Sequence, residues 1–160
     1  PVLYRAFGSR EGLVIAAQAE RYRRSIADIV EFLAVRFEAA ASRDDLKRSL
    51  REAADVAFDP ARSGPRRLRA EVVGSAVSRP DLQQQIVTVD RAMVTRLENA
   101  LAHGVAAGWL SGGPRLRAVL MWVIGATNGR LNVEFDPETS IAREWNDVAY
   151  EGVIHALFPD

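Results

Sequence analysis

Residues 9–41 read SREGLVIAAQAERYRRSIADIVEFLAVRFEAAA, and their apolar pattern decides the fold class. Apolar residues recur at steps of three and four, which is the period of one face of a helix. Ser9 stands just before this stripe and is a favoured N-cap residue. The pattern therefore predicts a long helix from Ser9 to Ala41. Its buried stripe consists of Ile15, Ala19, Tyr22, Ile26, Ile29, Leu33, Phe37 and Ala40.

The rest of the chain keeps the helical period, and no stretch of useful length alternates as a half-buried strand does. Serine caps and Pro or Gly breaks divide it into segments. The predicted fold class is all-α, a multi-helix bundle. We expect five more helices, over about residues 42–58, 65–78, 114–135 and 139–158, and from the Arg79-Pro80 boundary to near Gly108.

Composition narrows the classes of function. The 160 residues fit one domain, and 21 basic residues balance 21 acidic ones, which argues against a chain that coats nucleic acid along its whole length. The absence of cysteine excludes disulfide scaffolds, Cys-ligated zinc, iron–sulfur clusters and thiol nucleophiles. We find no membrane-length apolar run and no signal peptide at the start, which favours a cytoplasmic protein.

The most specific motif is VLYRAFGSREGL at residues 2–13, in the arginine-rich N-terminal part of the chain. It resembles the end of the DNA-recognition helix and the start of the next helix in TetR-family transcriptional regulators, where the pattern is Leu-Tyr-x-x-Phe-x-Ser/Asn-Lys-x-x-Leu. Arg10 keeps the charge of the family's Lys, whereas Ala6 stands where many members have His, so one common phosphate contact is absent. The matching residues are Leu3, Tyr4, Phe7, Ser9 and Leu13.

The resemblance implies a bundle of TetR C-terminal type preceded by a truncated helix-turn-helix. Residues 1–8 would end the DNA-recognition helix, and residues 9–160 would form the ligand-binding and dimerisation domain. The chain starts at Pro1 without a methionine, and we expect the remainder of the DNA-binding domain upstream. The implied function is a ligand-responsive DNA-binding regulator, more often a repressor, released from its operator by a small, largely apolar molecule. The implied partners are operator duplex DNA, a small-molecule effector and a second copy of the chain, with no cofactor, metal or membrane.

The motif also has a physical reading of its own. Leu3 and Phe7 are four residues apart and can pack on one helix face, which leaves Tyr4 and Arg5 available to a phosphate or a base edge. Arg10 lies beside the N-terminus of the long helix, and a helix N-terminus favours anions. Tyr4, Arg5 and Arg10 are therefore the DNA-contact candidates. The alternative for each is a solvated surface residue.

A regulator of this kind would hold its effector inside the helical bundle. Ligand pockets are mostly apolar with a few placed polar groups, and the sequence offers such residues. The alternative for each is plain core packing or a polar group satisfied locally. The pocket candidates are Tyr22, Phe37, Phe58, Glu71, Met93, His103, Trp109, Trp122 and Asn128.

The last two predicted helices, over residues 114–135 and 139–158, are apolar on two sides. A helix that is apolar on both sides is buried on both sides, and in a small domain a partner chain is the simpler cover. We therefore expect a dimer seam built from two helices of each protomer. The alternative is an ordinary central core helix. The interface candidates are Trp122, Gly125, Gly129, Val133, Trp145, Val148 and Gly152.

We do not expect an enzyme, because the catalytic motifs fail on inspection. The chain has no Gly-x-Ser-x-Gly elbow and no Gly-rich phosphate loop. Glu151 and His155 lie one residue too far apart for the repeated Glu-x-x-His of a helical di-iron site, and the pair occurs once. Two alternatives to the regulator stay open: a helical small-molecule-binding or assembly module without a DNA role, and a small-molecule enzyme on a helical bundle.

Overall fold

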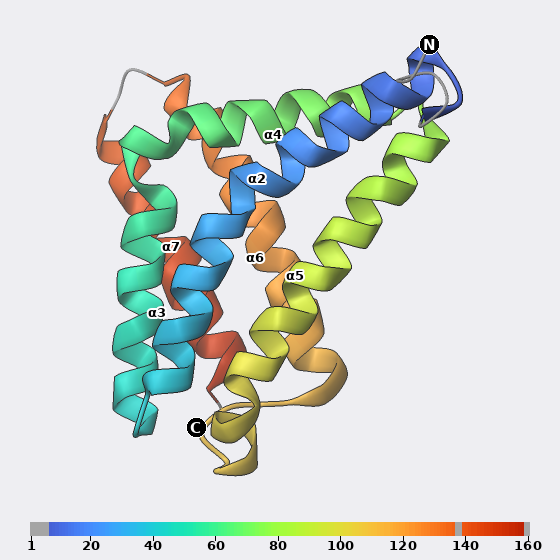
Figure 1. Ribbon diagram of the computed structural model, residues 1–160. Helices are drawn as coiled ribbons and strands as arrows, with labels where there is room; N and C mark the ends of the chain where they lie inside the picture. The colour runs from blue at the N-terminus through green and yellow to red at the C-terminus, as the bar shows by residue number, and fades with distance from the viewer. Residues whose placement is uncertain (1–6, 137–138, 159–160) are drawn as a thin grey trace.

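The computed structural model describes residues 7–136 and 139–158. Within these ranges the prediction of an all-α fold is confirmed, and no strand occurs (Figure 1). No helix of the described part combines the length and the apolar character needed to span a bilayer. The elements are α2 (Arg10–Ala39), α3 (Arg43–Phe58), the 3-10 helix η1 (Pro60–Arg62), α4 (Ser63–Ala76), α5 (Pro80–Ala106), α6 (Gly113–Glu134) and α7 (Thr139–Leu157).

Serine caps start the first two of these helices, as predicted. The Ser9 hydroxyl accepts a hydrogen bond from the backbone N–H three residues on at 2.9 Å, and the Ser42 hydroxyl does the same at 3.1 Å. Helix α4 differs from the prediction and begins at Ser63, because η1 leads directly into it. Pro65 then lies in the first turn of α4, where its missing N–H is not needed.

Helix α2 is the central element of the bundle. It packs most extensively against α5 and also contacts α3 and α4. Figure 1 shows α4 crossing one end of the bundle, α3 beside α2, and the α6–α7 pair behind them. This arrangement buries one continuous core between the layers. Its largest fully buried apolar side chains are Tyr22, Phe37, Leu46, Leu82, Leu101, Leu157 and Val72.

The start of α2, the end of α4 and the start of α5 meet at one corner of the bundle, at the upper right of Figure 1. The Arg79 guanidinium joins them, since its Nη1 donates to the Ser75 hydroxyl at 2.8 Å and to the Gln18 side-chain oxygen at 3.2 Å. Gly8 has a φ of +71°, a conformation that glycine adopts without strain, and it turns the chain into the Ser9 cap. Residues 7–13, the described part of the motif, therefore lie at this three-helix corner.

Candidate functional site

A pocket lies at the centre of the bundle, with a cavity volume of about 130 Å³. This volume is close to that of a dry, engineered protein cavity of about 150 Å³ that binds benzene. Its wall is built by α2, α3, α5, α6 and α7, and η1 and α4 contribute to it at the crossing end. The pocket is therefore enclosed by most of the fold rather than carried by one loop.

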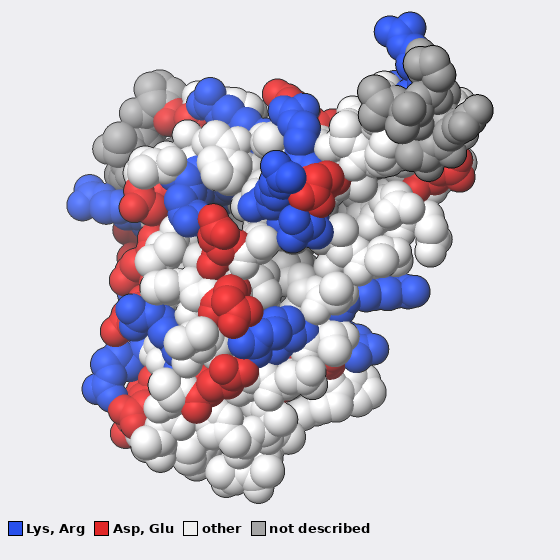
Figure 2. Space-filling model, viewed as in Figure 1, with Lys and Arg blue, Asp and Glu red and all other residues white. Residues whose placement is uncertain are grey.

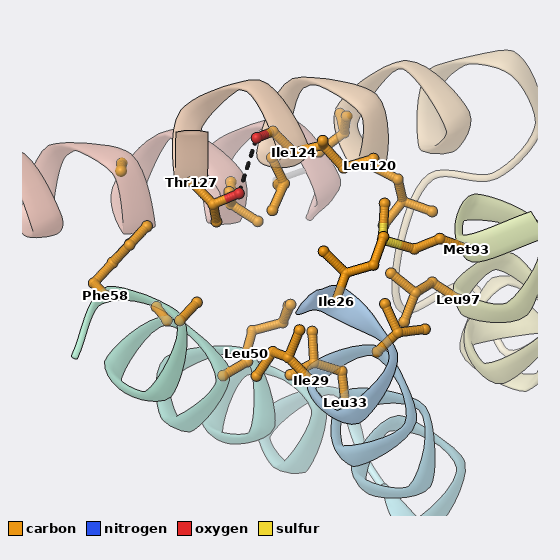
Figure 3. Close-up of a pocket in the computed structure, with 18 of the residues that line it drawn as sticks. Ile26, Ile29, Leu33, Leu50, Phe58, Met93, Leu97, Leu120, Ile124 and Thr127 are labelled. Atoms are coloured by element: carbon orange, nitrogen blue, oxygen red, sulfur yellow. Dashed lines mark hydrogen bonds between the residues drawn. The ribbon is translucent and has the colours of Figure 1, made fainter. Parts of the chain in front are cut away.

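Most of the wall of this pocket is apolar. Thr127 carries a hydroxyl, but it donates to the Ile124 carbonyl of its own helix at 2.8 Å, the dashed line in Figure 3. A ligand body held here would therefore contact mainly hydrocarbon. Figure 3 shows the apolar side chains that surround the common space: Ile26, Ile29, Leu33, Leu50, Phe58, Met93, Leu97, Leu120 and Ile124.

Three arginines also line the pocket: Arg62, Arg66 and Arg69. Their spacing of four and three residues places them on one side of the chain where η1 leads into α4. Arg66 is fully buried, and its Nε donates to the Glu134 carboxylate at 2.6 Å. It also donates to the backbone carbonyls of Ala57 and Asp59, at 2.7 and 2.9 Å. The charge and the donors of Arg66 are therefore matched by the protein itself.

Arg69 is only 7% exposed and has a different set of partners. Its Nε donates to the Asn128 amide oxygen at 3.0 Å, and its Nη1 to the Ser25 carbonyl at 3.3 Å. No carboxylate of the described residues forms an ion pair with it. Burial lowers the pKa of Arg69 to about 10, and the neighbouring Tyr22 acts in the opposite direction. The group is still protonated at neutral pH, so a buried positive charge faces the pocket without a counter-charge.

A hydrogen-bonded pair of a tyrosine and a carboxylate, Tyr22 and Asp90, lies near the Arg69 guanidinium. The Tyr22 hydroxyl donates to Asp90 Oδ1 at 2.9 Å, so this carboxylate of α5 already has a hydrogen-bond partner. Burial raises the pKa of Tyr22, and burial likewise raises the pKa of the Asp90 carboxyl, although the hydrogen bond from Tyr22 acts against the second shift. Neither residue lines the pocket itself.

The structure places three of the nine predicted pocket residues in the wall: Phe37, Phe58 and Met93. Tyr22 and Asn128 are not in the wall. Asn128 accepts a hydrogen bond from Arg69, and Tyr22 is close enough to raise the pKa of Arg69. The arginines were not among the residues singled out by the sequence analysis. Their spacing of four and three residues was the available signal, but nothing in the sequence alone distinguishes a buried arginine from a solvated one.

The other four predicted pocket residues lie elsewhere. Glu71 is exposed on α4, contrary to the expectation of a polar group on a buried face. The His103 ring lies between the carbonyls of Ala40 and Ala100, at 3.1 and 3.2 Å, and Trp109 packs edge-on against it. These two rings therefore pack together at the C-terminal end of α5 and do not line the cavity. Trp122 points outward and is 47% exposed.

The predicted DNA-contact residues fall at the edge of the described structure. Tyr4 and Arg5 lie outside the described residues. Arg10 is the first residue of α2 and is exposed beside the Ser9 cap. Its position leaves the guanidinium accessible to a ligand outside the bundle.

The predicted interface residues on α6 and α7 do not share one environment. Trp122 and Val148 are exposed, and a Cβ added at Gly125 or Gly129 would meet nothing within 4 Å. Gly152 differs, because a Cβ there would lie 2.9 Å from the Trp122 ring, so this glycine makes room for the contact of α6 with α7. Val133 is half-buried.

Trp145 is directed inward rather than onto the outer face. Its ring packs edge-on against Phe58, with 5.1 Å between centroids, and Phe58 lines the pocket. Other large apolar residues are exposed on the same two helices. They are Met121 on α6 and Ile141 on α7, and Phe135 is exposed directly after the end of α6.

The comparisons with known proteins find no match. No protein-family model matches the chain, and neither the curated proteins nor the solved structures contain a significant neighbour. Within the described ranges, no group of three or more His, Asp or Glu side chains is arranged to hold a metal ion. The functional argument therefore depends on the pocket, the exposed apolar face and the N-terminal motif.

Proposed function

We propose that the chain is the ligand-binding and dimerisation part of a TetR-type transcriptional regulator, which binds operator DNA through a helix-turn-helix ending at residue 8. The observation that carries the proposal is the continuity of two features. The motif at residues 2–13 leads into the Ser9 cap of α2, and the same helix supplies Ile26 and Ile29 to the wall of an enclosed apolar pocket. One rigid element thus joins the proposed DNA end to the ligand end.

The proposed coupling runs along α2. Its 30 residues span about 45 Å at 1.5 Å per residue. A ligand that displaces the pocket end of α2 would shift the corner where Arg79 holds Gln18. In a dimer this shift would change the separation of the two DNA-binding units, which must match the spacing of the half-sites on the duplex.

The exposed apolar face of α6 and α7 supports the dimeric part of the proposal. Trp122 and Val148 are too exposed for core residues of a monomer, and the glycines at 125 and 129 leave open space for close approach of another backbone. Exposed apolar patches of this kind mark sites of association. A second copy of the chain related by a two-fold axis would bury the same face on both protomers.

The alternative is a helical small-molecule-binding module without a DNA role. Figure 2 favours it in one respect, because basic and acidic side chains are interspersed on the viewed face and do not form a basic stripe. The formal net charge of zero is consistent with this view. A DNA role would therefore depend on the N-terminal end and not on the bundle surface.

The test is selection of duplexes from a random library by the full-length protein. Enrichment of a two-fold symmetric sequence is the expected result, and failure to enrich any duplex contradicts the proposal. Arg10→Ala should weaken binding to all duplexes alike and lower the slope of log affinity against log salt by about one unit. Arg21→Ala, on an exposed position further along α2, is the matched control and should leave that slope unchanged.

A further inference from the structure

The buried charges of the bundle do not balance. Among the residues that the structure describes, three charged side chains are buried: Arg66, Arg69 and Arg130. The carboxylate beside them is the nearly buried Glu134, which pairs with Arg66 and lies 3.8 Å from Arg130. Asp90 accepts the Tyr22 hydroxyl instead. The interior next to the pocket therefore holds more positive than negative charge.

Arg69 is the group left without a counter-charge. A buried charge is costly unless it is paired, and the partners of Arg69, an amide oxygen and a carbonyl, are dipoles and not charges. Its Nη2 has no hydrogen-bond partner among the described residues. Arg62 lines the same pocket and has no ion pair within the described ranges. Of the three arginines that line this cavity, two therefore have no carboxylate partner among the described residues.

We propose that the pocket binds a small amphipathic carboxylate, with its apolar body among Ile26, Met93, Leu97 and Leu120 and its carboxylate on Arg69. A guanidinium with a free Nη binds a carboxylate with short, charge-assisted hydrogen bonds, and Arg62 adds a second positive charge. The cavity of about 130 Å³ limits the body to about one ring or a short alkyl chain. The inference rests on the proposed function only in taking this pocket as the effector site.

The observations favour an acid over a neutral molecule of the same shape. The apolar wall binds either body equally, so the difference between them comes from the unpaired arginines, mainly the hydrogen bonds of Arg69 and to a lesser degree the charge of Arg62. A neutral ligand would leave the guanidinium buried without a counter-charge, whereas a carboxylate supplies it. The acid is therefore expected to bind about tenfold more tightly than its amide, the lower end of what a charged hydrogen bond contributes.

The experiment is calorimetric titration of the full-length protein with two matched pairs: octanoate and octanamide, and 3-phenylpropionate and 3-phenylpropanamide. In the unchanged protein at least one acid should bind, about tenfold more tightly than its amide. Arg69→Gln should remove most of that preference by weakening the acid and leaving the amide unchanged, because Arg62 supplies charge but not the hydrogen bonds of Arg69. Arg69→Lys should keep part of it. Arg67→Gln, on the exposed side of α4, should alter neither affinity.

Three results overturn the inference: no probe binds, the acid and its amide bind equally, or Arg69→Gln keeps the preference in a protein whose circular dichroism is unchanged. Duplex selection with the same preparation separates the two proposals. A charge preference that depends on Arg69, without any selected duplex, keeps the inference and contradicts the regulator. A selected duplex without a charge preference keeps the regulator and contradicts the inference.

Discussion

Helix α6 has two apolar faces, of which one is enclosed in the bundle and the other is exposed. Leu120 and Ile124 point into the pocket, where five helices enclose them. Trp122 and Gly125 lie on the other side, where the tryptophan is about half exposed and the glycine has open space in front of it. The composition of the two faces is similar, but one is concave and closed and the other is open.

The difference shows why an apolar stripe alone does not define a function. A closed wall with an unpaired cation at one end suits a small molecule, since pockets combine apolar lining with few polar groups. An open face on two adjacent helices suits a second protein surface. In the proposed regulator the ligand site and the dimer seam would thus lie on opposite sides of one helix, and α6 would connect them.

The largest expected effect is a loss of stability on replacing one of the arginines that line the pocket. Arg66→Gln should lower the free energy of unfolding by about 3–5 kcal/mol, because it leaves the buried Glu134 carboxylate without its main partner. Arg69→Gln removes a buried charge that has no carboxylate partner, so stability should stay equal or rise. Urea unfolding of both variants measures the contrast. Equal losses of unfolding free energy in the two variants would show that Arg69, like Arg66, has a charged partner.

The second prediction compares two neighbours on α6. Leu120→Ala should cost about 2–4 kcal/mol of unfolding free energy, because Leu120 is 7% exposed and its truncation enlarges the cavity. Met121→Ala should cost less than about 1 kcal/mol, because Met121 is 44% exposed on the outer side. Urea unfolding at low protein concentration checks both values. A large loss for Met121→Ala at that concentration would mean that the outer face packs within the protomer.

The third prediction concerns the outer face alone. Gly125→Leu should weaken the dimer by about 1–3 kcal/mol per site, because overpacking disturbs a close seam and a two-fold axis repeats it. The protomer should keep its helical content, since a Cβ at this position meets nothing within 4 Å. Analytical ultracentrifugation over a concentration series measures the change. Gly129→Leu should act in the same way, and a tight dimer in both variants would exclude this face as the seam.

The fold was predictable because its signals are local. Apolar periodicity and the serine caps placed the starts of α2 and α3 within one residue, since a cap depends on only three or four neighbouring residues. The start of α4 was displaced by two residues, because η1 continues into it without a break. That continuity depends on the path of the chain and not on local preference.

The site was predictable only in its apolar part. Periodicity indicates which side of a helix is buried, so Phe37, Phe58 and Met93 were found. It does not indicate which neighbour the buried side contacts. The packing of His103 against Trp109, away from the cavity, was therefore not predicted. The buried Arg69 could not be inferred, because a charged residue is read as solvated unless its environment is known.

The smallest expected effect is on the pH dependence of stability, and it compares a partly buried carboxylate, Asp90, with an exposed one, Glu20. Burial raises the pKa of Asp90, so its stabilising contribution is present below its ordinary value of 3.8 and is lost as the pH rises through the folded value. Glu20 on the surface of α2 is the opposite case. Hydrogen bonds from Arg23 and Arg24 lower its pKa to about 2, so its contribution is present above 4.5 and is lost as the pH falls toward 2.

The two carboxylates therefore predict pH dependences of opposite sign. Asp90→Asn should be more stable than the unchanged protein at pH 7, and its advantage should shrink as the pH falls, because the native carboxyl then binds its proton. Glu20→Gln should be less stable at pH 7, with a deficit that also shrinks toward acid pH. Urea unfolding from pH 7 to pH 3 follows both differences. A deficit for Asp90→Asn at pH 7 would show that the hydrogen bond from Tyr22 to the ionised carboxylate outweighs the cost of burying its charge.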